Sequence, residues 1–534
     1  MKLIKNNKIV NRKFILFLIL IVLLSTFCSL LFVKNHSLVA HDESLYASRA
    51  KLIIDTNNWW TPFDKAHHKT IGSYWLTALI FKGLGLNEFT ARFPSYLFSI
   101  SSIFVLFKIV KLLSSAQIAL ISIITVSSSY LWFSYSHYCS PDTLYIFLNL
   151  LGVYNLLKVD KEVKKEIKNR YLFLSGFFLS LSFFVRSFMQ LLPLVSLSPL
   201  IFYKIQKLNK NNTNHIIIGF IVGLIPLVIY FFISFNNYGV SSLVEPYQLL
   251  QTKSLTENNI FEGFIFYPRN LIIFTLPFCI FIFNGTRLIL RTRSKDLIFL
   301  FVVTPLINIL ILLLTASKYS HYALFAIPFI ASNASFGIYE CSKSKSSISK
   351  LTLRIFALFN TIISTSIFLS LFFRSYLNIQ NKFTLIELVI IIGLSLISLS
   401  ISISLFLNVK LGLSNINSIL SILSIQIVLL SFLFAKGIIG NPNNKFKQFV
   451  YEREIHEIVV NNKIYLIGKL DDKLQHLLKF YLPSQEKFNL EGVSSKEPLY
   501  GFIADKDVSQ LRNSNKYKFK VIKKYENINF IKFI

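Results

Sequence analysis

The sequence predicts an α-helical polytopic membrane protein with a small α/β domain at its C-terminal end. Of its 534 residues, 53% are hydrophobic and only 15% are charged, against about 25% charged residues in soluble domains. The mean hydropathy is +0.55. Apolar runs of about twenty residues recur over the first four-fifths of the chain, and each can cross a hydrocarbon core about 30 Å thick. The composition becomes polar after Gly440–Asn444.

The N-terminal segment resembles a retained signal anchor. Its first apolar run, Phe14–Val33, follows five basic residues: Lys2, Lys5, Lys8, Arg12 and Lys13. A cleaved signal peptide has a shorter apolar core, and basic residues before a span keep it on the cytoplasmic side. We therefore expect a cytoplasmic N-terminus and an external loop over residues 34–91.

The remaining apolar runs bring the expected number of spans to about thirteen. We expect interfacial helices around 43–55 and 73–86, and a second long external loop at 236–269. The further spans are expected at 92–112, 115–134, 141–157, 171–185, 188–204, 216–235, 270–286, 297–315, 320–339, 352–373, 383–407 and 414–435.

The charge distribution agrees with this topology. The loops expected inside are basic, namely 158–170, 204–210, 287–295 and 343–350. Lys and Arg accumulate in cytoplasmic loops, so the net charge of +30 needs no nucleic-acid partner. An odd number of spans then puts the C-terminus outside. Residues 1–435 form the predicted transmembrane domain, which includes the external loop 34–91.

Residues 436–534 are predicted to form the external α/β domain. Strands are expected at 463–467, 500–504, 516–522 and 528–534, with helices near 471–480 and 505–512. The cysteines (Cys28, Cys139, Cys279 and Cys341) have no metal or redox spacing. We find no HxxE-type or carboxylate-rich cluster with metal-ligand spacing, so we expect no cofactor and no metal.

The topology brings several costly polar residues to the external face. Ionisable side chains at membrane depth are expensive and tend to be functional. The residues concerned are Asp42, Glu43, Lys69, Asp142, Arg186, Lys318, His321 and Tyr322. Single members have simpler explanations: Asp142 suits a helix N-terminus, Arg186 could be a snorkelling cation, and His321 could be a satisfied interfacial histidine. Their convergence on one face is harder to explain by packing.

This set suits attack on a substrate that carries a lipid phosphate or pyrophosphate. The cations Lys69, Arg186 and Lys318 would neutralise a phosphate leaving group. The carboxylate of Asp42, with Asp142 in support, would accept a proton from a hydroxyl acceptor or position it. Nearby carboxylates also stabilise an oxocarbenium-like centre in glycosyl transfer.

The first external loop resembles the signature of the GT-C membrane glycosyltransferases, above all the bacterial aminoarabinose transferase and protein O-mannosyltransferase group. The resemblance is carried by D-E-x-x-Y-A (Asp42 to Ala47), N-W-W-T-P (Asn58 to Pro62), H-K-T-I-G-S-Y-W-L (His68 to Leu76), G-L-N-E (Gly85 to Glu88) and A-R-F-P-S (Ala91 to Ser95). A K-x-x-H-Y segment (Lys318 to Tyr322) is similar as well. By motif the resemblance covers roughly residues 14–340.

The resemblance implies an inverting glycosyltransferase of the bacterial plasma membrane. It would move a sugar from a polyprenyl-phosphate donor to a cell-envelope acceptor, such as lipid A or another glycan, on the outer face. Asp42 would be the principal catalytic carboxylate, Asp142 the second, and Glu43 a support for the first. Donor phosphate binding would fall to five residues: Lys69, Arg186, Lys318, His321 and Tyr322.

The chain also departs from the aminoarabinose transferase pattern. His68 and Thr70 flank Lys69 where that group carries an acidic residue and prolines, and Val244–Tyr247 replaces a stretch that tends to contain a histidine. Both differences leave the acceptor open. A protein O-mannosyltransferase acting on Ser/Thr is the alternative within the enzyme class. A transporter for a lipid-linked substrate is the alternative outside it, although the midplane segments are nearly free of ionisable residues.

Overall fold

A computed structural model describes residues 12–33, 36–40, 42–253, 260–315, 317–344, 346–372, 384–407, 414–440, 445–462, 464–467, 472–482, 485–488, 499–513, 518–525 and 527–533. The helical region contains α1 (Arg12–Phe32), α2 (Asp42–Thr56), α3 (Gly72–Leu84), α4 (Glu88–Leu113), α5 (Ala116–Ser127), α6 (Tyr130–Ser136), α7 (Asp142–Lys158), α8 (Lys165–Arg186), α9 (Leu191–Ile205), α10 (Lys210–Tyr238), α11 (Ser241–Lys253), α12 (Ile260–Thr275), α13 (Ile282–Arg291), α14 (Lys295–Ile298), α15 (Thr304–Leu314), α16 (Ile327–Lys343), α17 (Ser347–Phe372), α18 (Leu385–Leu407) and α19 (Asn415–Ala435). Short turns of other helix types include η3 (Val159–Lys161), η4 (Ser187–Gln190), η6 (Phe278–Phe281), η7 (Phe299–Val303) and η8 (Ser320–Ala326).

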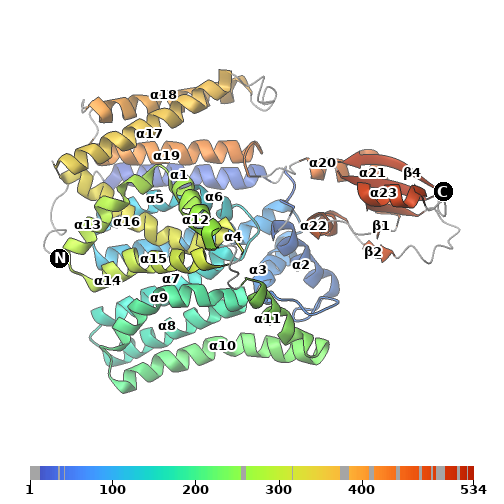
Figure 1. The fold of residues 1–534 in the computed structure, drawn as a ribbon, viewed down its shortest axis with the longest axis horizontal. Helices are drawn as coiled ribbons and strands as arrows, with labels where there is room; N and C mark the ends of the chain where they lie inside the picture. The colour runs from blue at the N-terminus through green and yellow to red at the C-terminus, as the bar shows by residue number, and fades with distance from the viewer. Residues whose placement is uncertain are drawn as a thin grey trace.

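The sheet region follows the helical region. It contains α20 (Phe446–Val450), α21 (Arg453–Asn461), β1 (Ile464–Ile467), α22 (Asp472–Tyr481), β2 (Gln485–Phe488), β3 (Tyr500–Ala504), α23 (Asp505–Asn513), β4 (Phe519–Tyr525) and β5 (Ile528–Phe533). Figure 1 shows long helices lying side by side in one block, with the sheet region at the end opposite the label of the N-terminus. The short helices α2 and α3 lie between the two regions.

The structure is that of a multi-pass membrane protein, but it does not confirm the expected thirteen spans. Among the described residues, nine helical segments are long and apolar enough to cross a membrane, or up to eleven when two bent pairs each count as one. One expected span, α7, has 17 residues, which is only about 26 Å of helix. Two others fall within the single stretch 165–205 of 41 residues, in which η4 separates α8 from α9.

A second difference concerns the expected external loop at 236–269. The described part of this segment is mostly helical, because α10 continues to Tyr238 and is followed by α11 and the first turns of α12. Pro246 lies inside α11 and Pro268 inside α12. Proline usually indicates a helix boundary or a kink, but α11 and α12 both continue through theirs.

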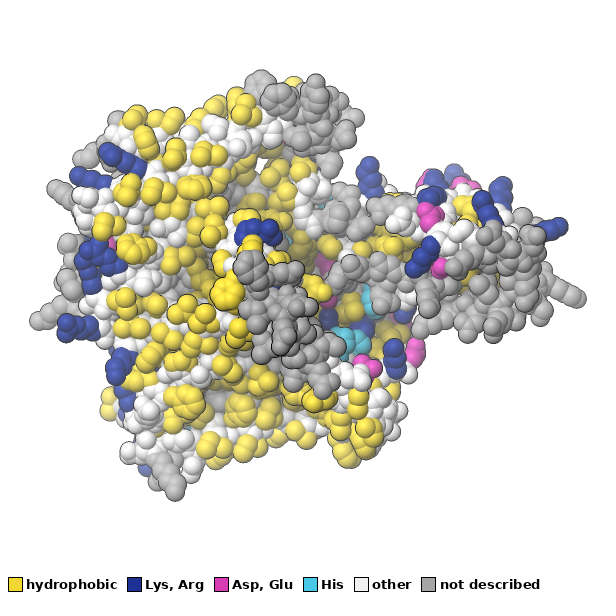
Figure 2. Space-filling model, in the orientation of Figure 1, with side chains coloured by type: hydrophobic (Ala, Val, Ile, Leu, Met, Phe, Trp, Pro, Cys, Tyr) yellow, Lys and Arg dark blue, Asp and Glu magenta, His cyan; other side chains and the backbone are white. Residues whose placement is uncertain are grey.

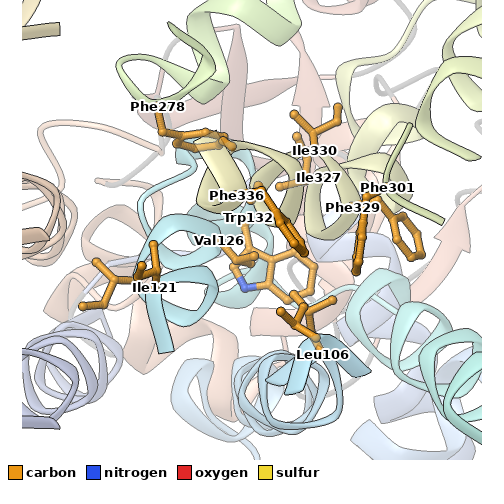
Figure 3. Packing of buried hydrophobic residues seen from close by; sticks show 14 of the residues in the cluster. Leu106, Ile121, Val126, Trp132, Phe278, Phe301, Ile327, Phe329, Ile330 and Phe336 are labelled. Carbon is orange, nitrogen blue, oxygen red and sulfur yellow. The ribbon is translucent and has the colours of Figure 1, made fainter. Parts of the chain in front are cut away.

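The core of the helical region is built from large apolar side chains. Trp132 is 2% exposed and lies beside Phe336 and Leu106 in Figure 3. Phe301 and Phe329 extend the same cluster. Because these side chains come from α4, α6, α16 and η7, the cluster joins helices that are far apart in the sequence.

The sheet region has five strands in the order β2-β1-β3-β5-β4 among the described residues. The pairs β1–β2 and β1–β3 are parallel, whereas β3–β5 and β4–β5 are antiparallel. Four of these strands and both helices α22 and α23 were expected from the sequence; β2 was not. The ends 463, 516–517 and 534 of expected strands lie outside the described residues.

The sheet region packs against the helical region rather than standing apart from it. One apolar cluster contains Tyr46 and Tyr74 of α2 and α3 together with Phe446, Leu478 and Phe502 of the sheet region. In addition, Lys51 Nζ donates to the carbonyl oxygens of Lys479 at 3.2 Å, Phe480 at 3.3 Å and Leu482. The sheet region is therefore docked directly onto the helix that begins at Asp42.

Charged side chains are concentrated at the two ends of the helical region. In Figure 2 hydrophobic side chains cover the sides of the region, Lys and Arg lie at the end near the N-terminus, and histidine and charged side chains gather beside the sheet region. Lys204 is 3% exposed and bridges Asp160 at 2.5 Å and Asp296 at 2.8 Å. These two ion pairs join η3, the end of α9 and α14 at one end of the helical region.

Candidate active site

The site is organised around the first turn of α2, where two adjacent carboxylates have different surroundings. Asp42 and Glu43 are the first two residues of the helix, where the helix dipole favours negative charge. Successive residues of an α-helix point about 100° apart. As a result, the side chain of Asp42 is 39% exposed whereas that of Glu43 is 3% exposed.

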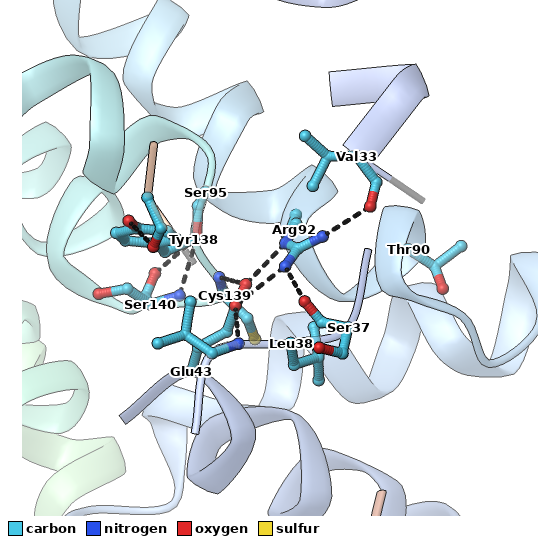
Figure 4. A network of polar contacts seen from close by, with 12 residues as sticks. Val33, Ser37, Leu38, Glu43, Thr90, Arg92, Ser95, Tyr138, Cys139 and Ser140 are labelled. Carbon is cyan, nitrogen blue, oxygen red and sulfur yellow. Dashed lines mark hydrogen bonds and ion pairs between the residues drawn. The ribbon is translucent and has the colours of Figure 1, made fainter. Parts of the chain in front are cut away.

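Glu43 belongs to a buried network that fixes α2 in place. Its Oε1 accepts from Arg92 Nε at 2.7 Å and from the backbone N–H of Cys139 at 3.0 Å. Its Oε2 accepts from Arg92 Nη2 at 3.0 Å and from the backbone N–H of Val39 at 2.6 Å. Figure 4 shows Arg92 at the centre of this network, which also reaches the carbonyl oxygens of Val33 and Ser37. Glu43 is thus a structural carboxylate.

Asp42 pairs with a cation across the first loop. Lys69 Nζ lies 3.0 Å from Asp42 Oδ1 and 4.3 Å from the centre of the Tyr46 ring. Tyr46 is one helical turn after Asp42, so it lies on the same face of α2. Burial raises the pKa of Tyr46, which keeps its hydroxyl protonated.

Asp142 forms the second carboxylate–cation pair. Arg186 Nη2 lies 2.6 Å from Asp142 Oδ1, and Arg186 Nη1 donates to the Tyr46 hydroxyl at 3.0 Å. The hydroxyl of Ser140 donates to the other carboxylate oxygen of Asp142. Tyr46 therefore lies between the cation of the first pair and the cation of the second.

Asp42, Lys69, Tyr46 and Arg186 border a cavity of about 420 Å³, within the range of small-ligand sites. Its polar wall is formed mainly by the loop after α2, the start of α3 and the start of η8, and its apolar wall by the turn between α8 and α9 together with Pro246 of α11. The lining residues are Asp42, Leu45, Tyr46, His68, Lys69, Thr70, Ser73, Val185, Arg186, Ser187, Phe188, Met189, Pro246, Ser317, Tyr319, His321 and Tyr322.

Glycine permits the close approach of α3 to the end of α8. A Cβ added at Gly72 would lie 2.5 Å from the carbonyl oxygen of Phe184, so any side chain there would push the two helices apart. Ser187, which ends α8, has a φ of +51°, a left-handed conformation that favours glycine. These two features bring the first loop and Arg186 to opposite sides of one cavity.

The structure brings together most of the residues that the sequence singled out. Asp42, Lys69, Arg186, His321 and Tyr322 all line the cavity. Asp142 reaches it through Arg186. Two residues do not face the cavity: Glu43 is turned into the buried network, and Lys318 Nζ donates to the carbonyl oxygens of Leu313 at 3.0 Å and Thr315.

Several residues at the site were not selected from the sequence. Arg92 appeared only as part of A-R-F-P-S, and its pairing with Glu43 could have been suspected from the cost of burying either charge alone. Arg49 Nη1 contacts His67 Nδ1 and the Tyr74 hydroxyl, both at 2.7 Å. Nothing in the sequence pattern indicates that contact. Within the described ranges, no group of three or more His, Cys, Asp or Glu residues could hold a metal ion.

Comparison with known proteins agrees with the fold. Residues 68–231 match the family model described as dolichyl-phosphate-mannose-protein mannosyltransferase. Over 216 residues, 39% of this chain and 37% of the relative, the sequence is 30% identical to the undecaprenyl phosphate-alpha-4-amino-4-deoxy-L-arabinose arabinosyl transferase of Wigglesworthia glossinidia brevipalpis. That alignment therefore spans little more than a third of the curated relative.

The structural likeness extends over nearly the whole chain. The crystal structure of ArnT from Cupriavidus metallidurans in the apo state matches with a TM-score of 0.71 at 13% identity, over 97% of both chains. The same protein bound to undecaprenyl phosphate matches with a TM-score of 0.72 at 13% identity, over 98% of both chains. The chain therefore has the fold of ArnT, and its residues 68–231 match the protein mannosyltransferase family model.

Proposed function

We propose that this protein is an inverting glycosyltransferase that moves a sugar from a polyprenyl-phosphate donor to a cell-envelope acceptor. One observation carries the proposal: two carboxylate–cation pairs, Asp42–Lys69 and Asp142–Arg186, meet at the same cavity. The names of the similar proteins support the donor class, since ArnT has been crystallised with undecaprenyl phosphate. Fold likeness alone would not support an activity.

The cations give the cavity affinity for the phosphate of the donor. Lys69 and Arg186 lie on opposite sides of Tyr46, with contacts to its ring at 4.3 Å and to its hydroxyl at 3.0 Å. Both can turn toward a phosphoryl group and stabilise the charge that develops when it leaves. His321 and Tyr322 extend the same polar wall.

Asp42 acts on the other reactant, the acceptor. In the proposed reaction an acceptor oxygen attacks the anomeric carbon, the bond from that carbon to the phosphate oxygen breaks, and polyprenyl phosphate leaves. Asp42, with its side chain 39% exposed, would take the proton of a hydroxyl acceptor. Asp142 would hold Arg186 in position, while Glu43 would hold α2.

The apolar wall can accommodate the prenyl chain of the donor. Val185, Phe188, Met189 and Pro246 line the cavity on the side of α8, α9 and α11. Phe188 is 41% exposed, so this wall is continuous with the hydrophobic surface of the helical region. A prenyl chain can therefore remain in the membrane while its phosphate enters the cavity.

We place this site, and the sheet region beside it, on the outer face of the plasma membrane, with the N-terminus in the cytoplasm. The basic loops lie at the opposite end of the helical region, where Lys204 bridges Asp160 and Asp296. The positive-inside rule assigns that end to the cytoplasm. Residues 1–435 form the transmembrane domain in this proposal, and 436–534 the external domain.

The acceptor is proposed to be a glycolipid, such as lipid A, or another glycan. The family description that matches residues 68–231 favours a second candidate, transfer of mannose to Ser/Thr of proteins. The two differ in what the enzyme modifies. Mass spectrometry of the lipids, glycans and secreted proteins of a deletion strain identifies which of these loses a sugar.

The test of the proposal complements that strain with single variants. Wild-type protein should restore the missing sugar, whereas Asp42→Asn and Asp142→Asn should not, at equal membrane abundance. Asp64→Asn, an exposed acid of the same loop, is the matched control and should restore it fully. Restoration of the missing sugar by Asp42→Asn and Asp142→Asn would contradict the proposal. An unchanged set of glycoconjugates in the deletion strain would contradict it as well.

A further inference from the structure

Thr70 is a buried hydroxyl on the cavity wall that has no hydrogen-bond partner in the part of the chain that the structure describes. The residue is 2% exposed, its side chain contributes to the lining, and Oγ1 makes no hydrogen bond with the described residues. A buried polar group without a partner is strongly disfavoured. Such a group at a cavity is therefore a candidate for contact with a ligand.

A second unpartnered donor belongs to the same cavity. Arg186 uses Nη1 and Nη2 to contact Tyr46 and Asp142, but its Nε is buried and has no partner among the described residues. Nε–H can only donate a hydrogen bond. The ligand that completes this wall must therefore supply hydrogen-bond acceptors.

The surrounding charge favours an anion as that ligand. Thr70 directly follows Lys69 and precedes the first residue of α3, Gly72. The N-terminus of a helix favours negative charge and phosphate groups. Contact of Gly72 with the backbone of Phe184 holds this end of α3 beside the end of α8 that carries Arg186.

We infer that Thr70 Oγ1 donates a hydrogen bond to a phosphoryl oxygen of the lipid-linked donor, on the wall that it shares with Lys69 and Arg186 Nε. The inference rests on the proposed function and adds a residue to it. Phosphoryl oxygens are acceptors only, which matches two unpartnered donors, whereas a sugar hydroxyl would also present donors. Thr70 is thus a substrate-contacting residue that binds the phosphate.

The experiment compares Thr70→Val with Thr70→Ser in the purified full-length protein. Valine has nearly the same shape and no hydroxyl, and serine keeps the hydroxyl. The probe is polyprenyl phosphate without a sugar, so any effect on its dissociation constant concerns the phosphate and the lipid alone. The melting temperature without lipid is the second measurement.

We expect Thr70→Val to weaken binding of the probe about tenfold, as for loss of a hydrogen bond to a charged group. Thr70→Ser should stay within about twofold of wild type. Without lipid, the valine variant should melt at or above the wild-type temperature, because an unpartnered buried hydroxyl is replaced by a methyl group.

Two results would overturn the inference alone. The first is that Thr70→Val binds the probe with wild-type affinity. This result is also the one expected if the Thr70 hydroxyl contacts the sugar of the donor instead of its phosphate. The second is that Thr70→Val melts several degrees below wild type without lipid, because the Thr70 hydroxyl of the wild-type protein would then have a partner in the protein. Failure of the wild-type protein to bind polyprenyl phosphate is a different result, and it would overturn the proposed function as well.

Discussion

At the scale of single residues, two neighbouring carboxylates have separate tasks because of where the helix directs them. Glu43 is held by Arg92 and by two backbone N–H groups inside the protein. Asp42 faces a cavity and has one cation within 3.0 Å. A carboxylate therefore stabilises the fold at Glu43, whereas the carboxylate of Asp42 is available for chemistry.

The buried pair of Glu43 and Arg92 makes a prediction about stability. Arg92→Met should lower the free energy of unfolding by about 3–5 kcal/mol, because it leaves a buried carboxylate without its partner. Arg453→Met is the matched control: its pair with Glu457 is 93% and 63% exposed, and such pairs contribute at most about 1 kcal/mol. Thermal denaturation in detergent measures both, and equal shifts would contradict the assigned role of the buried pair.

Lys69 makes a prediction about the donor. Lys69→Met should raise the KM for the polyprenyl-phosphate donor about 10- to 100-fold, because a charge-assisted hydrogen bond to phosphate is lost. Stability should change by less than about 1 kcal/mol, since the Lys69–Asp42 pair is partly exposed. Lys69→Arg should recover part of the affinity. Kinetics with a varied donor concentration measure the effect, and an unchanged KM would remove Lys69 from the phosphate site.

At the scale of elements, α2 connects the cavity to the sheet region. Its start carries Asp42, and its middle carries Lys51, which caps the C-terminal end of α22. The last carbonyl groups of a helix lack partners within it, and a cation there is favourable. Burial lowers the pKa of Lys51, and the nearby carboxylate of Asp55 acts in the opposite direction.

Removal of this cap should loosen the sheet region. Lys51→Met should lower the stability of α22 by about 1–3 kcal/mol, because three carbonyl groups lose one charged donor. Relative to wild type, amide hydrogen exchange should then become faster over Asp472–Tyr481 and stay unchanged over α8. Lys506→Met, on the exposed side of α23, should change neither segment. Unchanged exchange in α22 after the Lys51 substitution would show that the apolar contacts suffice for docking.

At the scale of the whole molecule, two histidines make stability depend on pH. Burial, with Arg49 and Lys479 close by, lowers the pKa of His476 to about 3. Burial and Arg49 also lower the pKa of His67. Both side chains are neutral in the folded protein, whereas in the unfolded chain they take up a proton below about pH 6.5.

Each neutral histidine therefore makes its complete contribution to the free energy of unfolding above about pH 6.5. This contribution decreases as the pH falls toward the pKa of the folded state. At pH 5, His476 alone should reduce the free energy of unfolding by up to about 2 kcal/mol. Melting temperatures of wild type and His476→Gln between pH 7.5 and pH 5 test this. The variant should show the smaller decrease, and parallel curves would contradict the expectation.

The orientation in the membrane is testable on the same scale. In a variant without the native cysteines, Lys506→Cys in the sheet region should react with a membrane-impermeant maleimide in intact spheroplasts. Lys164→Cys, between η3 and α8, should react only after permeabilisation, since it lies at the basic end. The reverse pattern would invert the proposed topology.

Much of the fold followed from local patterns. Apolar runs indicated the long helices, the interfacial helices α2 and α3 were expected within two residues of their observed bounds, and alternation in the tail indicated β1, β3, β4 and β5. The expected number of spans was not confirmed, because α7 has only 17 residues and two expected spans form the single segment Lys165–Ile205. The helix α11 lies wholly within the stretch that was expected to be a loop.

By itself, the sequence determined that this is a multi-pass membrane protein in which one group of ionisable residues, including Asp42, Lys69, Asp142 and Arg186, belongs to the end opposite the basic loops. Hydropathy and charge bias are local properties, so they can be read without knowing contacts. Tertiary structure decided which carboxylate faces the cavity, which cation pairs with which acid, and that Thr70 lines the wall. These depend on side-chain direction and on contacts between segments as far apart in the sequence as Asp42 and Tyr322, which no local pattern contains.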